Sequence, residues 1–243
     1  MVATIQLYDL ELLGLPKTVF SCNTLKTRIA LNLKGLPFET KWLDFATVKE
    51  VIPTLTKQNP ELKRPTVPVI VDSISGQDKV IQDSYDIAVY LEKQYPNTPS
   101  LFHNNPGVHR FFQQYCESVL LLPLFKLVMF IIHKQCGPDV LQDWWREDRE
   151  RMFGCSLDVF AGNRDDNILA VKNALLPIIK VLKEFPFMTG EQVGWADVVL
   201  AADFKMMAAL DPVTFESVFL SGFETPADDV LIQNWWKRMS VYI

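Results

Sequence analysis

The sequence predicts an α/β domain followed by an all-helical domain, and three observations support this. Between residues 1 and 96, short β-rich runs alternate with segments of helical spacing. Prolines and asparagines are concentrated in residues 97–106, which we interpret as a linker. From residue 107 to residue 243, apolar residues recur at helical spacing and no β-rich run interrupts them.

The order of elements in the first domain predicts β-α-β-α followed by β-β-α. The first unit requires a parallel strand pair joined by a crossover helix, and the second indicates a hairpin and a final helix. Gly35 is placed to end the first helix, whereas Pro53 lies inside the second. The expected strands are residues 4–8, 38–45, 67–71 and 79–82, the expected helices are 24–33, 47–57 and 83–95, and residues 75–77 are the expected hairpin turn.

The second domain is predicted to consist of helices with apolar stripes. Its most apolar stretch, residues 119–132, contains Pro123 and Lys126 and is short for a bilayer, so we interpret it as part of a buried helix rather than a membrane span. The expected helices are residues 108–134, 140–157, 168–185, 195–210 and 230–239.

The composition is that of a globular protein with a sizeable core, since 49% of the residues are hydrophobic and 22% are charged. The formal net charge is −5 and no run of Lys or Arg stands out, so no nucleic acid partner is expected. The N-terminus lacks a basic segment followed by an apolar one, which makes the cytoplasm the expected location.

Cysteine and histidine spacing suggests neither a disulfide framework nor a metal site. There is no Cys-x-x-Cys pair, and the histidines show no spacing typical of metal ligands, so free thiols and no metal are expected. The residues concerned are Cys22, Cys116, Cys136 and Cys155, with His103, His109 and His133.

Three segments of the first domain resemble the glutathione transferase family. Residues 20–28 are similar to the active-site loop and the helix after it, Thr66-Val67-Pro68 is similar to the strand start with a cis-proline, and Asp83-Ser84 is similar to the acidic-Ser pair at the next helix. Their order and separations match the thioredoxin-like domain. The resemblance therefore implies a thioredoxin-like N-terminal domain followed by an all-α helical-bundle domain.

Within this family the chain is most similar to the fungal, etherase-like class A transferases, in residues 21–37, 149–150 and 153–154. Two positions depart from the pattern. Cys22 stands where the subgroup usually has Pro, and Gly194 stands where the family usually has Ser or Thr before a buried helix. Because Gly is a tolerable N-cap and Asp197 can serve the first-turn amides, we expect the fold to survive.

The resemblance implies that Ser21 activates glutathione. A free thiol has a pKa of roughly 8.5, so only a few per cent is ionised at neutral pH. A hydrogen bond from the Ser21 hydroxyl, aided by the helix N-terminus, would lower that pKa by about 1–2 units. The alternative is that Ser21 only caps the helix. Asn23 would orient the sulfur or the substrate, or else bond to the loop backbone.

The same resemblance implies the residues that hold glutathione. Val67, before a cis bond to Pro68, would pair with the peptide backbone of glutathione. Ser84 would bind the γ-glutamyl carboxylate at a helix start and Asp83 the ammonium, although both also suit ordinary capping. The spacing does not choose among the candidate donors for the glycyl carboxylate, which are Gln58, Lys63 and Arg64.

The second substrate is expected between the domains, at a site lined by aromatic and apolar side chains. Aromatic residues at helical spacing are also typical of a core, so the alternative for each is a packing role. Leu101 and Phe102 are expected to clamp the domains together. The candidate walls are Phe112, Tyr115, Val119, Phe125, Trp144 and Trp145.

These features predict a glutathione transferase with glutathione as cosubstrate. The thiolate would attack electrophilic aromatic or lignin-derived compounds, by conjugation as in detoxification or by β-aryl-ether cleavage. One alternative is a non-catalytic carrier of aromatic molecules, as in a ligandin. Another is a thiol transferase acting through Cys22, which would lie near unpaired first-turn amides that favour a thiolate. The alternative for Cys22, and the more frequent one for a Cys in a first helical turn, is that it simply packs inward. The family resemblance also implies a homodimer.

Overall fold

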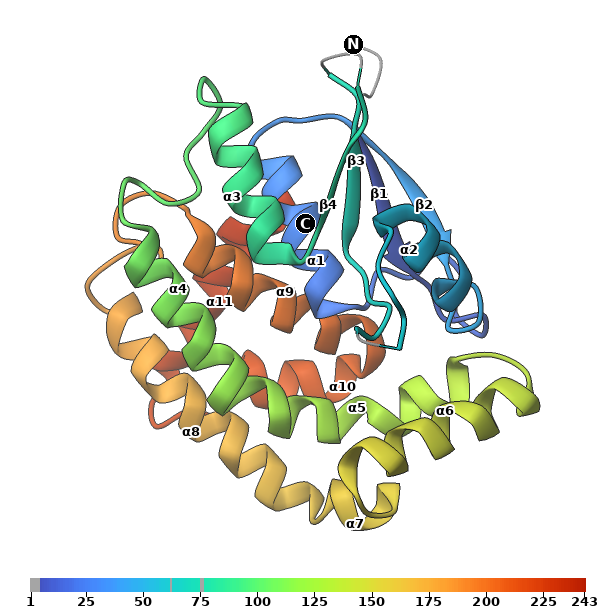
Figure 1. Cartoon of the computed structure of the whole chain (residues 1–243). Coiled ribbons are helices and arrows are strands. Elements are labelled where there is room, and N and C mark those ends of the chain that lie inside the picture. Colours follow the sequence, from blue (N-terminus) through green and yellow to red (C-terminus); the bar gives the residue numbers. More distant parts are fainter. Residues whose placement is uncertain (1–4, 62, 75–76) are drawn as a thin grey trace.

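The computed structural model describes residues 5–61, 63–74 and 77–243, in an α/β domain packed against a helical domain (Figure 1). One mixed sheet has the strand order β2-β1-β3-β4. The pair of β1 and β2 is parallel, whereas β1 with β3 and β3 with β4 are antiparallel, which confirms the predicted crossover unit and hairpin. The predicted turn at 75–77 falls mostly outside the described residues. The strands are β1 (Ile5–Leu10), β2 (Phe38–Leu43), β3 (Val69–Asp72) and β4 (Lys79–Gln82).

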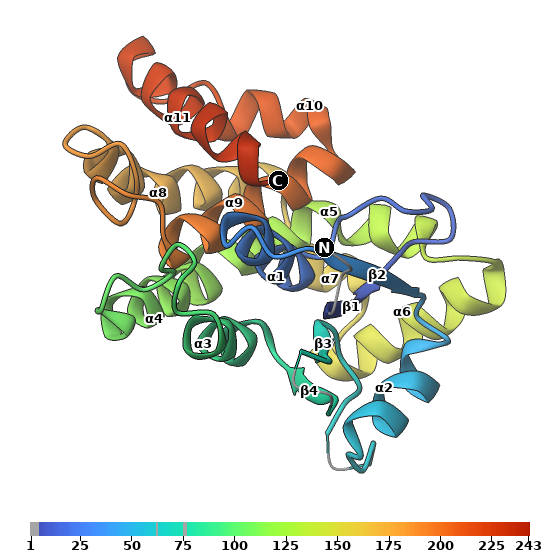
Figure 2. The same cartoon turned by 90° about the horizontal axis from the view of Figure 1, so that it is seen from above.

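Helices cover both faces of this sheet. α1 (Cys22–Leu33) and α3 (Ser84–Gln94) lie on one side and α2 (Val48–Thr56) on the other, as Figure 2 shows. Alternation along the strands explains the division, since successive side chains point to opposite faces. Ile70 joins the large core under α1, while its neighbour Val69 belongs to the small cluster with α2.

The second domain is a helical bundle around α9 (Trp195–Leu210), whose bounds match the predicted helix. α9 also packs against α1, so the two domains share one hydrophobic core. The other helical elements are α4 (Pro106–Tyr115), η1 (Cys116–Leu120), α5 (Leu121–Gln135), α6 (Asp139–Phe153), α7 (Leu157–Ala161), α8 (Arg164–Leu182), α10 (Pro212–Thr214), η2 (Phe215–Phe219), α11 (Pro226–Met239) and η3 (Ser240–Tyr242).

Two predicted helices are interrupted or end early, while those expected over 168–185 and 230–239 each begin four residues earlier than predicted, at Arg164 and Pro226. The helix expected over 108–134 contains a π-helical turn, η1, three residues before Pro123. Proline has no N–H to donate to the carbonyl of Val119, so the regular ladder is interrupted here. The helix expected over 140–157 ends at Phe153, because Gly154 takes a left-handed conformation with φ of 71°, and α7 follows separately.

The run formed by α4, η1 and α5 is longer than expected. It spans Pro106–Gln135, 30 residues with a hydropathy of 2.0 in its most apolar window, so by length and composition alone it could cross a membrane. The apolar stretch 119–132, which we expected to be short for a bilayer, is therefore part of a helical run that is long enough for one. Buried side chains of α5 such as Leu124 and Val128 belong to the bundle core, as in the central helix of a globular bundle. One such helix is weak evidence for a membrane span.

The start of α9 explains why Gly194 is tolerated. A Cβ at this position would lie 2.9 Å from the carbonyl oxygen of Leu101, so a side chain has no room. The capping is supplied by Asp197, whose carboxylate accepts from the Gly194 N–H at 3.2 Å and from the Trp235 indole N–H at 2.9 Å. The fold therefore survives the departure from Ser or Thr.

The linker is tied to both domains. The Phe102 ring lies 5.7 Å from the ring of Tyr85 in α3 and 6.2 Å from that of Trp195 in α9. The backbone N–H of Trp195 donates to the Leu101 carbonyl at 2.7 Å. Leu101 and Phe102 are both buried and thus hold α3 and α9 together, as the sequence predicts.

Candidate active site

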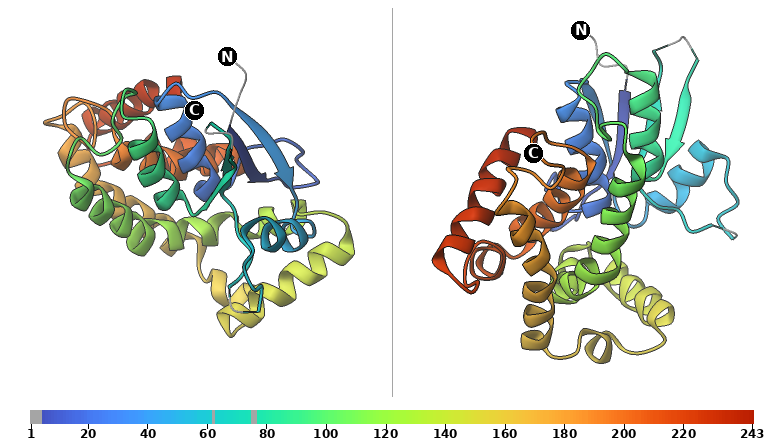
Figure 3. Two further views of the ribbon diagram at one scale, coloured as in Figure 1. Left: turned by 45° about the horizontal axis from the view of Figure 1, so that its top comes forward. Right: turned by 90° about the vertical axis from the view of Figure 1, so that its left-hand side faces the viewer.

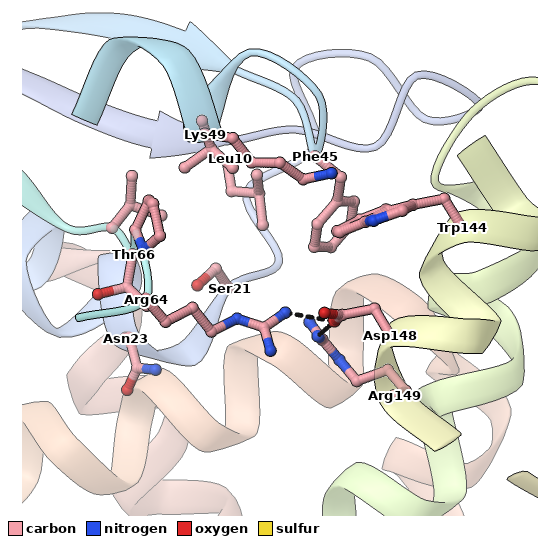
Figure 4. A pocket seen from close by; sticks show the side chains of 13 residues that line it. Leu10, Ser21, Asn23, Phe45, Lys49, Arg64, Thr66, Trp144, Asp148 and Arg149 are labelled. Carbon is pink, nitrogen blue, oxygen red and sulfur yellow. Dashed lines mark hydrogen bonds and ion pairs between the residues drawn. The ribbon is translucent and has the colours of Figure 1, made fainter. Parts of the chain in front are cut away.

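Three adjoining cavities lie where the two domains meet. The outer cavity, of about 440 Å³, opens between α2 and α6 and is drawn in Figure 4. The inner cavity, of about 250 Å³, reaches toward α5 and α9, and the side cavity, of about 360 Å³, adjoins the start of α3. Ser21 lines the outer and inner cavities, and Asn23 lines all three.

Ser21 is the N-cap residue of α1, but its side chain makes no capping hydrogen bond. Its backbone is fixed instead, since the Ser21 carbonyl accepts from the Leu25 N–H at 2.8 Å and from the Thr24 hydroxyl at 3.1 Å. The half-buried hydroxyl points toward the outer cavity in Figure 4. The alternative that Ser21 serves only as a side-chain cap therefore has no support in the observed geometry.

Asn23 is held by a side chain rather than by the loop backbone. Its Oδ1 accepts from Nζ of Lys26 at 3.2 Å. With the carbonyl oxygen so engaged, the amide N–H groups are the part of Asn23 available to the cavities that it lines. The residue can thus donate hydrogen bonds near the position that Ser21 faces.

Cys22 borders the inner cavity, but its environment disfavours the thiolate that the thiol transferase alternative requires. Its side chain is only 7% exposed. Burial raises the pKa of Cys22 to about 12, the Asp203 carboxylate adds to this rise, and Lys26 and nearby backbone groups oppose it. Desolvation outweighs the first-turn amides, so the thiol stays protonated at neutral pH.

The loop before β3 has the predicted geometry, because the Val67-Pro68 peptide bond is cis. Thr66 and Val67 line both the outer and the side cavity. The backbone of Val67 therefore lies where an extended peptide could run from one cavity to the other.

The side cavity collects polar groups at the start of α3. Asp83 has a φ of 81°, a region that non-glycine residues rarely adopt and that costs about 1–3 kcal/mol. One of its oxygens accepts from the Tyr85 N–H at 2.9 Å, so Asp83 caps the helix and still borders the cavity. Ser84 is buried beside it, and Glu117 of η1 faces the same space from the helical domain.

Of the three candidates for a glycyl carboxylate donor, the structure brings one to a cavity. Arg64 lines the outer cavity, whereas Gln58 and Lys63 line none of the cavities described here. A second cation, Lys49 of α2, lines the same cavity and points toward Trp144 in Figure 4. Burial lowers the pKa of Lys49, as does Arg64, while Asp148 opposes the shift.

The candidate walls divide into two groups. Phe125 and Trp145 line the inner cavity, and Trp144 lines the outer one. The other three, Phe112, Tyr115 and Val119, line none of these cavities. Tyr115 is directed to α8 instead, because its hydroxyl donates to the Ala174 carbonyl at 2.7 Å.

Several lining residues are absent from the sequence-based candidates. Leu10 ends β1 and Phe45 follows β2, and both line the outer and inner cavities. The carboxyl ends of adjacent parallel strands meet at one sheet edge, and this rule could have identified them. No comparable sequence pattern identifies Lys49, Asp148 or Glu117 as lining residues. Among the described residues, no group of His, Cys, Asp or Glu is positioned to hold a metal ion.

Two family models match the chain. The N-terminal domain of glutathione S-transferase matches residues 20–94, and the C-terminal domain of glutathione S-transferase matches residues 107–217. Together they cover roughly three quarters of the chain.

Individual proteins show the same relationship. A glutathione S-transferase-like protein of Aspergillus flavus, ustS, is 25% identical over 207 residues, which are 74% of this chain and 71% of that protein. A zeta-class glutathione S-transferase of Euphorbia esula is 42% identical over 148 residues, which are 59% of this chain and 61% of the relative.

Solved structures extend the similarity to nearly the whole chain. Glutathione transferase GSTFuA3 of Phanerochaete chrysosporium has a TM-score of 0.82 and 27% identity, over 98% of this chain and 97% of its own. The glutathione S-transferase CsGST63524 of Ceriporiopsis subvermispora, solved in complex with glutathione, has a TM-score of 0.82 and 25% identity over the same shares. The chain therefore belongs to the glutathione S-transferase family, whose cosubstrate is glutathione.

Proposed function

We propose that this protein activates glutathione as a thiolate at Ser21 and transfers it to an electrophilic aromatic or apolar compound in the inner cavity. The observation that carries the proposal is the Ser21 hydroxyl, which makes no capping bond although Ser21 is the N-cap of α1 and lines both cavities. A sulfur bound there would receive this donor together with the partial positive charge of the helix N-terminus.

Glutathione would lie across the side and outer cavities. In this arrangement Ser84 and the start of α3 bind the γ-glutamyl carboxylate, and Asp83 and Glu117 bind the ammonium group. The backbone of Val67 pairs with the peptide, and the glycyl carboxylate turns toward Lys49 and Arg64. The cysteinyl sulfur then falls between these ends, at Ser21.

The chemistry follows from the energy of one charge-assisted hydrogen bond. Such a bond contributes about 1.5–3 kcal/mol, which corresponds to a fall of about 1–2 units in the pKa of the bound thiol. Phe20, Phe45 and Phe125 line the inner cavity, which suits an aromatic electrophile. Conjugation and cleavage of a β-aryl ether both begin with attack by the same thiolate.

We further propose a homodimer located in the cytoplasm.

Two alternatives make different use of the same space. Thiol exchange would need a reactive Cys22, and the burial of that thiol argues against it. A carrier of aromatic ligands would use the inner cavity without thiolate activation, so an uncommitted hydroxyl at Ser21 would have no function. We favour the transferase for this reason.

Thiolate absorbance of bound glutathione, titrated against pH, tests the proposal. Ser21→Ala should raise the pKa of the bound thiol by about 1–2 units, because the charge-assisted bond is lost. Ser21→Thr, which keeps the hydroxyl, is the matched control.

Calorimetry with glutathione reports binding separately, and a halogenated nitrobenzene, an isothiocyanate and a β-aryl ether report turnover. An unchanged pKa in Ser21→Ala would remove Ser21 from its role, and displacement of an aromatic dye without any turnover would indicate a carrier.

A further inference from the structure

The outer cavity is more positively charged than the chain as a whole. Three cationic side chains line it, Lys49, Arg64 and Arg149, against one carboxylate, Asp148. The formal net charge of the chain is −5, so this excess is local. A cleft lined by one sign of charge attracts ligands of the opposite sign.

The single carboxylate is shared between two of these cations. Asp148 Oδ2 accepts from Nη2 of Arg64 at 2.5 Å and also from Nη1 of Arg149. One carboxylate cannot neutralise two guanidinium groups, each of which carries five N–H donors. Positive charge and unused donors therefore remain beside the cavities.

Arg149 differs from the other two cations in its position. It lines both the outer and the inner cavity, whereas Lys49 and Arg64 line only the outer one. Its side chain is 14% exposed, and its guanidinium carbon lies 5.0 Å from the centroid of the Trp145 ring. A guanidinium is weakly hydrated and stacks on aromatic rings, so it suits this half-apolar setting.

Burial lowers the pKa of Arg149 to about 10, and the neighbouring Arg64 contributes to the fall, while Asp148 opposes it. At neutral pH the guanidinium is still charged. Partial desolvation also strengthens its attraction for a further anion, because less solvent screens the pair. Among the residues that line the inner cavity, Arg149 is the one with a cationic side chain; the others are apolar or uncharged.

We propose that Arg149 is an anion-binding residue for the second substrate, and that this substrate is an aromatic electrophile bearing a carboxylate. The inference rests on the proposed function, in which the glycyl carboxylate of glutathione occupies Lys49 and Arg64. Arg149 then remains for a ligand in the inner cavity, next to the sulfur at Ser21. A planar guanidinium binds a carboxylate through two parallel hydrogen bonds, which makes carboxylate the expected anion.

The test compares a chloronitrobenzoate with the matching uncharged amide. The ratio of their kcat/KM values is measured in wild type and in Arg149→Gln, so that intrinsic reactivity and any general loss of active protein cancel. The ratio should fall by about tenfold to a hundredfold in Arg149→Gln, because a charged bidentate contact is lost. Arg149→Lys keeps the charge but cannot form the two parallel hydrogen bonds. Its ratio of kcat/KM values should lie between those of wild type and Arg149→Gln.

Binding without turnover gives a second readout. A nitrobenzoate that has no leaving group should quench the tryptophan fluorescence near the cavity when it binds. Its Kd should rise in Arg149→Gln. The Kd should fall in Asp148→Asn, because this variant removes the carboxylate that competes for Arg149. Calorimetry with glutathione distinguishes failure of the proposed function from failure of this inference. Wild type that does not bind glutathione would reject the proposed function, whereas a protein that binds glutathione but shows no dependence on Arg149 would reject the inference. An unchanged substrate ratio in Arg149→Gln would overturn the inference. A loss of glutathione affinity equal to that for nitrobenzoate would also overturn it, by assigning Arg149 to the glycyl carboxylate.

Discussion

Arg64 in the first domain and Asp148 of α6 in the second are joined by an ion pair of 2.5 Å across the outer cavity. Beside it, Nζ of Lys49 in α2 lies 3.1 Å from the centroid of the Trp144 ring in α6. Figure 3, in its left panel, shows α6 beneath α2. The Lys49–Trp144 contact connects these two helices, while the ion pair connects α6 to the segment between α2 and β3. The Arg64 side chain is 43% exposed, so the pair contributes little to stability and can be broken without unfolding.

Arg64→Ala should raise the KM for glutathione by about tenfold, because a charged contact to the glycyl carboxylate is lost. The free energy of unfolding, measured in urea, should change by less than about 1 kcal/mol. Lys63→Ala removes a neighbouring cation that lines no described cavity and is the matched control. Equal effects of the two variants would show that general positive charge, not Arg64, binds the carboxylate.

Glu117→Gln should weaken glutathione binding by roughly tenfold, because an ion pair with the γ-glutamyl ammonium is lost. Glu117 is held in place by the side-chain amides of Gln113 and Gln114, both at 2.7 Å. Calorimetry with glutathione and with an analogue that lacks the amino group measures how much affinity depends on the ammonium. Wild type should discriminate strongly between the two ligands and Glu117→Gln weakly. The same discrimination in both proteins would exclude Glu117 from this contact.

Cys22 should resist alkylation at neutral pH. Burial raises the pKa of Cys22 to about 12, so the thiol is protonated at neutral pH, and the side chain is also shielded from solvent. Cys155 is partly exposed and should react first with iodoacetamide, and all four cysteines should react in denaturant. Mass spectrometry of the digested protein locates the adducts. A mixed disulfide at Cys22 after treatment with oxidised glutathione would revive the thiol transferase alternative.

Gly194→Ser should destabilise the protein by about 1–3 kcal/mol, although Ser is usual at this position in the family. The added Cβ would approach the Leu101 carbonyl oxygen at 2.9 Å and Cγ2 of Thr189 at the same distance. Gly107→Ser, where a Cβ meets nothing within 4 Å, is the control and should be close to neutral. Urea denaturation measures both. A stabilised Gly194→Ser would mean that the linker shifts to accept the side chain.

The stability should decrease as the pH falls from about 6.5 toward about 4, in part because of His109. Burial lowers the pKa of His109 to about 4, and His103 adds to the shift. The unfolded chain then binds a proton that the folded chain does not, so stability is lost in that window. His109 accounts for a loss of roughly 2–3 kcal/mol in the free energy of unfolding over this pH window. His109 Nδ1 also accepts from the Ala196 N–H at 3.1 Å, a bond that protonation would break.

Urea denaturation at several pH values checks this prediction, with His109→Asn as the comparison. Asparagine can accept the same hydrogen bond through its side-chain oxygen but does not titrate. The variant should lose less stability than wild type over this window. Parallel pH profiles for the two proteins would assign the acid sensitivity to other groups.

Much of the fold could be predicted from local patterns. β4 and α9 have the predicted bounds, because alternation in a strand and an apolar stripe in a helix are properties of neighbouring residues. The cis bond at Pro68 and the N-cap position of Ser21 were expected from the resemblance to the family. The π turn before Pro123 was missed, since helical spacing alone does not report a broken backbone ladder.

The cavities were decided by tertiary structure. Leu10 and Phe45 line the outer and inner cavities because two strands end at one edge of the sheet, and Asp148 lines the outer cavity because α6 lies beneath α2. The state of Cys22 likewise depends on burial against α9, which the sequence around it does not encode. A short sequence window determines whether a residue is helical, but the solvent, charge and neighbours of its side chain are set by segments far away along the chain.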